Sequence, residues 1–146
     1  RRFRREHTRI VRLFQYTERD GMDKVMCHNS INRNNCLYAE DTVNLIHWEH
    51  ASFGDPAFDF GQILSEYDLD SPAIDEILTA YLGRTDLERL HWTAYVALHH
   101  WCAFCWALYQ ESVGEDTGKK MLDFYRTAQQ ALDYALPRYE AYYKVH

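Results

Sequence analysis

The first 20 residues place apolar side chains among polar ones at helical spacing. A rough apolar stripe runs along them: Phe3, Ile10, Leu13, Phe14 and Tyr16. This spacing predicts a helix over residues 3–19, and the pair Asp20-Gly21 provides a helix stop.

Short apolar runs with the composition of strands follow this helix. Residues 25–27 form one such run, and residues 36–39 and 43–48 form two more around the turn Glu40-Asp41. These runs predict short strands, two of them paired as a hairpin. Residues 50–54 show no regular pattern, and we expect them to be irregular.

From residue 55 onward the pattern is helical. Asp55-Pro56 is a good N-cap followed by proline at the first helical position, which predicts a helix to about Tyr67. Ser71-Pro72 repeats this signal and opens a helix that ends at Gly83.

Two further helices are predicted towards the end of the chain. Thr85 and Glu88 have the spacing of a capping box and open a long helix to about Ser112. A last helix begins near Thr117 and is interrupted by Pro137. The whole pattern predicts one α+β, mostly α domain over residues 1–146, with short strands and a hairpin followed by about four helices.

Composition narrows the class of protein. With 47% hydrophobic residues, a chain of 146 residues can bury a sizeable core. Its net charge of −6 argues against a general nucleic-acid binder. Arginines nevertheless crowd the first 12 residues. This cluster is either a solvated helix face or a site for a phosphate-rich partner.

The cysteines indicate a reduced compartment, and the longest uncharged run indicates a buried helix. No secretory signal opens the sequence, so we expect a cytoplasmic protein without disulfides. Cys102 and Cys105 form a C-x-x-C inside a helical run, and we expect buried core thiols there, since redox and zinc pairs normally lie at turns. The run 92–109 contains His99 and His100, which are costly in lipid, so we expect a buried helix and no membrane span.

The stretch from Cys27 to Leu37, C-H-N-S-I-N-R-N-N-C-L, is close to a phosphoryl-transfer loop. Such a loop reads H-x-D-x-x-x-x-N, with a carboxylate two residues after the histidine. His28 and Asn35 occupy the first and last positions of this pattern, but Ser30 stands where the acid belongs.

Two ordered motifs extend this likeness to a family. The stretches V-M-C-H-N-S-I-N-R-N-N-C-L-Y and L-I-H-W-E-H-A-S-F-G-D-P-A-F-D-F-G resemble the choline/ethanolamine kinases and the related aminoglycoside phosphotransferases. The resemblance implies a protein-kinase-like fold, of which this chain is the C-terminal lobe and the N-terminal nucleotide lobe is absent. The sequence accordingly contains no Gly-rich phosphate loop and no V-A-I-K-like strand. The family uses Mg²⁺ and ATP to phosphorylate a small amino alcohol such as choline.

The resemblance also assigns roles to individual positions. Ser30 occupies the position of the family's catalytic base. Asn35 matches its amide metal ligand, and His47 stands at the position of its Mg²⁺ carboxylate. Asp59 matches a family acid whose expected role is structural, accepting hydrogen bonds from the backbone of the loop. We expect His28 to brace the loop in the same way.

Both catalytic acids of the family pattern are therefore replaced. Ser30 has no basicity near neutral pH, and the imidazole of His47 is a poor ligand for Mg²⁺, which prefers oxygen. Loss of a general base alone costs about 10²–10⁴-fold in rate. We expect this chain to be catalytically silent and to bind neither Mg²⁺ nor ATP.

An acceptor site for a quaternary ammonium is predicted on a late helix. Residues 105–109, C-W-A-L-Y, resemble the family pattern F-W-G-L-W. Trp106 and Tyr109 share a helix face, and aromatic faces attract such cations. Trp101 and Trp92 are further candidates. Aromatic side chains at helical spacing also occur as core residues, and that alternative stays open.

Two other interpretations remain. The positions of Ser30 and His47 face each other across the cleft in kinase-like folds, which suggests a hydrolase-like pair with Glu49 or Asp59 as the orienting acid. His28 and His47 alternatively suggest a transition-metal site. If Glu49 does not orient His47, it either faces the acceptor pocket or is a solvated charge. The other interpretation is a non-catalytic interaction module that self-associates through an exposed apolar surface.

Overall fold

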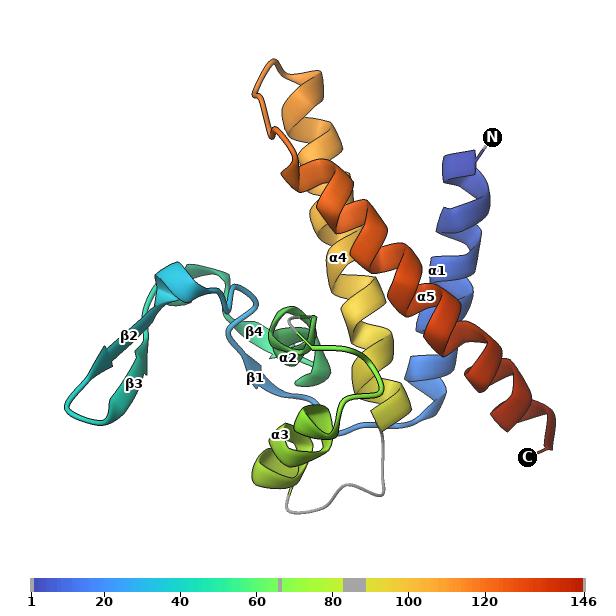
Figure 1. Ribbon diagram of the computed structural model, residues 1–146, viewed down its shortest axis with the longest axis horizontal. Coiled ribbons are helices and arrows are strands. Elements are labelled where there is room, and N and C mark those ends of the chain that lie inside the picture. Colours follow the sequence, from blue (N-terminus) through green and yellow to red (C-terminus); the bar gives the residue numbers. More distant parts are fainter. Residues whose placement is uncertain (1, 66, 83–88, 146) are drawn as a thin grey trace.

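A computed structural model describes residues 2–65, 67–82 and 89–145 of the chain. Its body consists of three long helices: α1 (Arg2–Arg19), α4 (Arg89–Ser112) and α5 (Lys120–Val145). α4 and α5 pack along each other, and α1 packs against both (Figure 1). The strands and the shorter helices lie on the opposite side of α4 from α1 (Figure 1). The α+β, mostly α class predicted from the sequence is confirmed.

The long helices owe their positions to their buried faces. In α1 the buried residues are three or four positions apart: Glu6, Ile10, Leu13 and Thr17. In α4 every residue from His91 to Leu98 is buried, as the long uncharged run predicts. No helix in the described part of the chain is long and apolar enough to cross a membrane.

The predicted interruption at Pro137 is wrong, because Pro137 lies inside α5. A proline inside a helix removes one backbone hydrogen bond and strains the preceding turn. Here Ala135, Leu136 and Tyr139 are all buried around it, while Pro137 itself is exposed. Packing of this face therefore holds the helix through the proline.

The strands form two small antiparallel pairs. β2 (Cys36–Ala39) and β3 (Thr42–Leu45) form the predicted hairpin, whose turn residues Glu40 and Asp41 have positive φ values of 51° and 57°. Such a two-residue turn matches the twist of the strands. β1 (Val25–Cys27) pairs with β4 (Ser52–Gly54). The expectation that residues 50–54 are irregular is therefore corrected.

Two short helices connect the strands to the body. α2 (Ala57–Leu64) ends earlier than predicted, and α3 (Pro72–Leu82) begins where Ser71-Pro72 indicated. α2 packs against α4 so closely at Gly61 that a Cβ atom there would lie 2.7 Å from the backbone oxygen of Tyr95. The predicted stop at Gly83 and the predicted capping box at 85–88 lie outside the described residues.

A buried charged cluster joins the end of α1 to the starts of α2 and α4. The ring of His91, 1% exposed, lies with Nδ1 2.7 Å from Asp20 and Nε2 2.8 Å from Asp55. Asp20 also accepts hydrogen bonds from the hydroxyls of Tyr139 and Tyr143 in α5. Burial alone would lower the pKa of His91, but the hydrogen bonds and charges of the two aspartates outweigh it and raise the pKa to about 9. His91 is therefore a cation at neutral pH, and both its ring nitrogens donate.

Candidate functional site

The loop after β1 is anchored to α2 by Asp59. The backbone N–H groups of His28 and Asn29 each donate to one carboxylate oxygen of Asp59, both at 2.7 Å. Asn29 has a φ of 63°, a conformation that asparagine tolerates better than most residues. This is the backbone-binding role expected of Asp59 from the sequence.

Both nitrogens of the His28 ring are bonded within the loop region. Nε2 lies 2.8 Å from the backbone oxygen of Ile46, which can only accept, so Nε2 carries the proton. Nδ1 accepts from the backbone N–H of Ser30 at 3.2 Å. The ring is 1% exposed, and Trp48 packs against it edge to face at 4.6 Å between ring centres. His28 thus joins the loop to the segment after β3.

Asn35 closes the other end of the loop. Its side-chain amide donates to the backbone oxygen of Ser30 at 2.8 Å and to the Ser30 hydroxyl at 3.2 Å. The backbone oxygen of Asn35 accepts from Ile46 at 3.0 Å. Asn35 lies at the end of a short 3₁₀ turn, Arg33–Asn35, capped by the side chain of Asn32. The loop is therefore closed by hydrogen bonds at both ends, most of them to backbone atoms and one to the Ser30 hydroxyl.

His47 lies apart from this network. It has a left-handed backbone conformation with a φ of 64° and directly precedes the 3₁₀ turn Trp48–His50. Its side chain is 60% exposed, and Nδ1 lies 3.5 Å from Oε1 of Glu49. No hydrogen bond joins Ser30 to His47, although the structure describes both residues. Glu49 does pair with His47, but the hydrolase-like arrangement considered from the sequence is not assembled.

The donors brought together at this loop suit Mg²⁺ poorly. The described residues contain no group of three histidine, cysteine or acidic side chains placed to hold a metal ion. Positions 30, 35 and 47 offer a hydroxyl, an amide and an imidazole, whereas Mg²⁺ binds carboxylates, phosphates and water. The carboxylate of Asp59 in α2, which contacts the loop, is already engaged by two backbone N–H groups.

The aromatic residues of α4 divide between its surface and the core. Trp106 and Tyr109 are 55% and 62% exposed and lie one turn apart. Trp92 and Trp101 are buried. Trp101 packs against α1, where its indole N–H donates to Nδ1 of His7 at 3.3 Å. Trp101 and Trp92 thus lie in the core, which is the alternative that the sequence left open for them.

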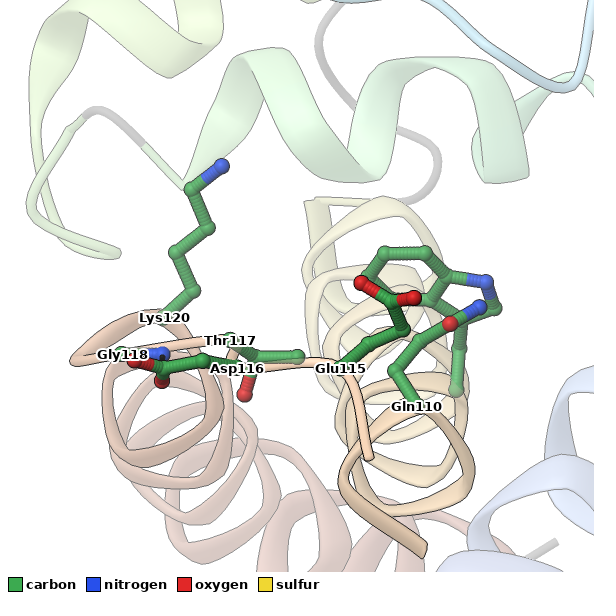
Figure 2. A pocket seen from close by; sticks show the side chains of 7 residues that line it. Gln110, Glu115, Asp116, Thr117, Gly118 and Lys120 are labelled. Carbon is green, nitrogen blue, oxygen red and sulfur yellow. Dashed lines mark hydrogen bonds between the residues drawn. The ribbon is translucent and has the colours of Figure 1, made fainter. Parts of the chain in front are cut away.

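A pocket of about 490 Å³ lies where α4 turns into α5. Its lining residues are Trp106, Gln110, Glu115, Asp116, Thr117, Gly118 and Lys120. Figure 2 shows Gln110 and Glu115 on one side of this pocket and Lys120 on the other. Hydrogen bonds fix the turn itself: Thr117 donates from its backbone and its hydroxyl to Glu111, and Gly118 donates to Asp116.

Sequence reasoning found Trp106 but missed the rest of this pocket. Glu115 and Asp116 lie in an exposed turn with no periodic pattern. Only their position shortly after the C-W-A-L-Y motif could have pointed to them. The pocket brings together the indole of Trp106 and the carboxylates of Glu115 and Asp116, which attract a cation, and the ammonium of Lys120, which repels one.

Arg5, Arg9 and Arg12 of α1 are paired with acids. Arg9 pairs with Glu6 and with Asp133 of α5, and Arg12 pairs with Glu140 of α5. These pairs favour the solvated helix face over the phosphate site, the two alternatives that the sequence left open.

The cysteines differ in exposure, and this corrects one expectation. Cys27 is buried and Cys36 is half-buried. In the C-x-x-C of α4, however, Cys102 is exposed and Cys105 is half-buried, so this pair is not a pair of core thiols.

Comparisons with known proteins agree with the family resemblance of the His28 loop and with the observed fold. Residues 2–93 match the phosphotransferase enzyme family, which includes the aminoglycoside phosphotransferases. Protein LicA of Haemophilus influenzae is 30% identical over 129 residues, which cover 82% of this chain and 42% of that protein. A second LicA sequence from that species is equally similar, with 33% of its length covered.

A solved structure shows the same fold. The crystal structure of choline kinase LicA from Streptococcus pneumoniae matches with a TM-score of 0.78 and 23% identity, over 90% of this chain and 48% of that protein. This chain spans less than half the length of each of these relatives. Because the family match covers more than half of the residues and includes the His28 loop, the chain belongs to the phosphotransferase enzyme family and has a choline kinase-like fold.

Proposed function

We propose that this chain is the acceptor-binding lobe of a choline kinase-like phosphotransferase that carries out no phosphoryl transfer itself. In this proposal it retains a pocket for a quaternary ammonium such as choline. The observation that carries the proposal is the contrast within one loop. His28, Asn35 and Asp59 keep their hydrogen bonds, while Ser30 and His47 stand where the family has acids.

The chemistry of the replaced positions supports the silent part of the proposal. Phosphoryl transfer depends on a base-like carboxylate at the acceptor and on carboxylate and amide oxygens that hold Mg²⁺. The Ser30 hydroxyl already accepts a hydrogen bond from Asn35 and has no basicity at neutral pH. His47 is exposed beside Glu49 rather than directed into a metal site.

The surface of α4 supports the binding part. Trp106 lines the pocket at the turn into α5, together with Glu115 and Asp116. A quaternary ammonium has no N–H to donate, so the faces of aromatic rings and nearby carboxylates are its natural partners. A cation over an aromatic face contributes roughly 0.5–1 kcal/mol at an exposed site and about 2 kcal/mol when it is desolvated.

Calorimetric titration with choline tests both parts, with and without Mg-ATP. We expect choline to bind and Mg-ATP neither to bind nor to change choline affinity. Trp106→Ala, which removes the aromatic side chain that lines the pocket, should weaken choline binding, and Tyr38→Ala, which removes an exposed tyrosine on the hairpin, should not. Absence of choline binding would refute the acceptor site, whereas turnover of ATP with choline would refute the silent assignment.

Exposed apolar residues favour a second candidate, a self-associating interaction module. Met26 in β1, Phe53 in β4, and Tyr38 and Val43 in the hairpin are 56%, 72%, 72% and 60% exposed. Such groups mark interaction surfaces when they are contiguous. Sedimentation velocity distinguishes the candidates: a defined dimer that Phe53→Ser dissociates would support the module, and a monomer at all concentrations would exclude it.

A further inference from the structure

The C-x-x-C of α4 is a pair of accessible thiols without an assigned role. Cys102 is exposed, Cys105 is half-buried, and both are free thiols. They lie three residues apart on the regular helix Arg89–Ser112, so both side chains project from the same face. Cys27 and Cys36 lie on separate strands of the loop region.

The spacing on a helix disfavours a disulfide and suits a bridging ion. Cβ atoms three residues apart on a helix are about 5–6 Å from each other, whereas a disulfide requires about 3.5–4.5 Å. Two metal–thiolate bonds in a line, at about 2.3 Å each as for zinc, span roughly 4.6 Å between the sulfurs. An ion can therefore join the thiols while α4 keeps its geometry.

We propose that Cys102 and Cys105 form a binding site for a soft metal ion that accepts two thiolates, such as Cu(I). Soft thiolate ligands select Cu(I) over hard cations. Zinc sites, in contrast, normally have four ligands, and no group of three potential ligands occurs among the described residues. His99, one turn earlier, packs its ring against Phe58 of α2 at 5.1 Å between ring centres. It thus belongs to the contact between α2 and α4.

Binding is an exchange of protons for metal. Both S–H bonds break, two sulfur–copper bonds form, two protons leave to solvent, and copper stays in the Cu(I) state. Desolvation by neighbouring side chains raises the pKa of both thiols, although Cys102 is exposed, and Cys102 raises the pKa of Cys105 further. This site does not depend on choline binding or on phosphoryl transfer.

Competition with a coloured Cu(I) chelator, under anaerobic conditions and with the full chain, tests the site. We expect one Cu(I) per chain. Cys102→Ser and Cys105→Ser should each weaken binding by about 10²–10⁴-fold. In the wild type, once one thiolate has bound the ion, the other binds it as an intramolecular ligand, and each variant loses this advantage. Cys36→Ser, which removes a half-buried thiol outside α4, is the matched control and should leave the affinity unchanged.

Two results would overturn the proposal. One is binding that survives in the Cys102→Ser, Cys105→Ser double variant, or a wild-type affinity no higher than that of the single variants. The other is copper-edge X-ray absorption that shows a nitrogen ligand or more than two sulfurs. Far-UV circular dichroism of each variant verifies that α4 remains folded, and Cys102→Ala, which favours the helix, replaces any serine variant that does not fold.

Discussion

The helical body and the loop region of this molecule are held together by different interactions. In the body, large side chains such as Leu13 and Leu132 are almost completely buried, and Trp92 of α4 is buried against Phe60 of α2 and Tyr81 of α3. In the loop region, residues 25–54, most side chains are exposed, and the buried residues include His28 and Asn35, which are polar. The comparison teaches that apolar packing provides stability, whereas a small set of polar contacts provides the shape of the loop.

The two regions meet at α2. Asp59 of α2 binds the loop, and Asp55, just before α2, binds His91 of α4. The first contact fixes local geometry at a surface, and the second joins helices in the interior. A change at the Asp55–His91 contact should therefore lower the free energy of unfolding, and a change at the Asp59 contact should mainly alter the local protection of the loop.

The largest effect is expected from His91→Gln. This change removes the cation between Asp20 and Asp55 and leaves two nearly buried carboxylates without their partner. Breaking such a buried ion pair costs about 3–5 kcal/mol. Urea unfolding should show this loss, while His50→Gln, at an exposed position, should leave the free energy of unfolding unchanged. Equal stability of the two variants would contradict the role given to the cluster.

The same cluster predicts a loss of stability at alkaline pH. The pKa of His91 is raised from 6.5 to about 9 on folding, so its contribution is complete below pH 6.5 and disappears as pH rises to 9. At 1.36 kcal/mol per pH unit this amounts to about 3 kcal/mol. The pKa values of Asp20 and Asp55 are lowered in spite of burial, mainly by His91, so stability should also fall under acidic conditions. Unfolding measured from pH 6 to 10 should show the alkaline loss in the wild type and not in His91→Gln.

A smaller and more local effect is expected from Asp59→Asn. The amide can accept from only one of the two backbone N–H groups of His28 and Asn29. A lost hydrogen bond to a charged group costs about 1.5–3 kcal/mol. Amide hydrogen exchange should accelerate at residues 28 and 29 while the amides of α4 and α5 stay protected. Equal acceleration of exchange in the loop and in α4 and α5 would mean that the loop and the body open as one unit. Asp41→Asn in the hairpin turn is the control and should leave exchange at residues 28 and 29 unchanged.

The smallest effect on stability is expected from restoring the acids, Ser30→Asp with His47→Asp. Position 47 is exposed and position 30 half-buried, so the free energy of unfolding should change by no more than about 0.5 kcal/mol. Aspartate also tolerates the left-handed backbone at position 47. Added Mg²⁺ should raise the thermal unfolding temperature of this double variant and should not raise that of the wild type. A collapse of stability would show that the replaced residues support the loop.

The sequence predicted what depends on neighbours in the chain. The helix 3–19, the turn at Glu40-Asp41 and the helix after Ser71-Pro72 all follow from local patterns, and all are present. β4 was missed because its three residues depend on pairing with β1, about 25 residues away. Pro137 misled because tertiary packing outweighs its local preference.

The candidate site shows the same division. The bonds of Asp59 to the loop followed from the family pattern of residues 55–59. The cluster around His91 did not, because its members lie far apart in the sequence and each alone is an ordinary polar residue. The burial of Trp101 was equally hidden, since helical spacing distinguishes faces but does not say which face meets α1.

The absence of a side chain at Gly61 has a consequence for how this loop can change. A methyl group there would meet the backbone of α4, so α2 would have to move outward and take Asp59 with it. The distance between α2 and α4 thus sets where His28 and Asn29 are held. Positions 30 and 47 play no part in that contact. Substitutions at these two positions therefore leave the contact between α2 and α4, and with it the position of Asp59, unchanged.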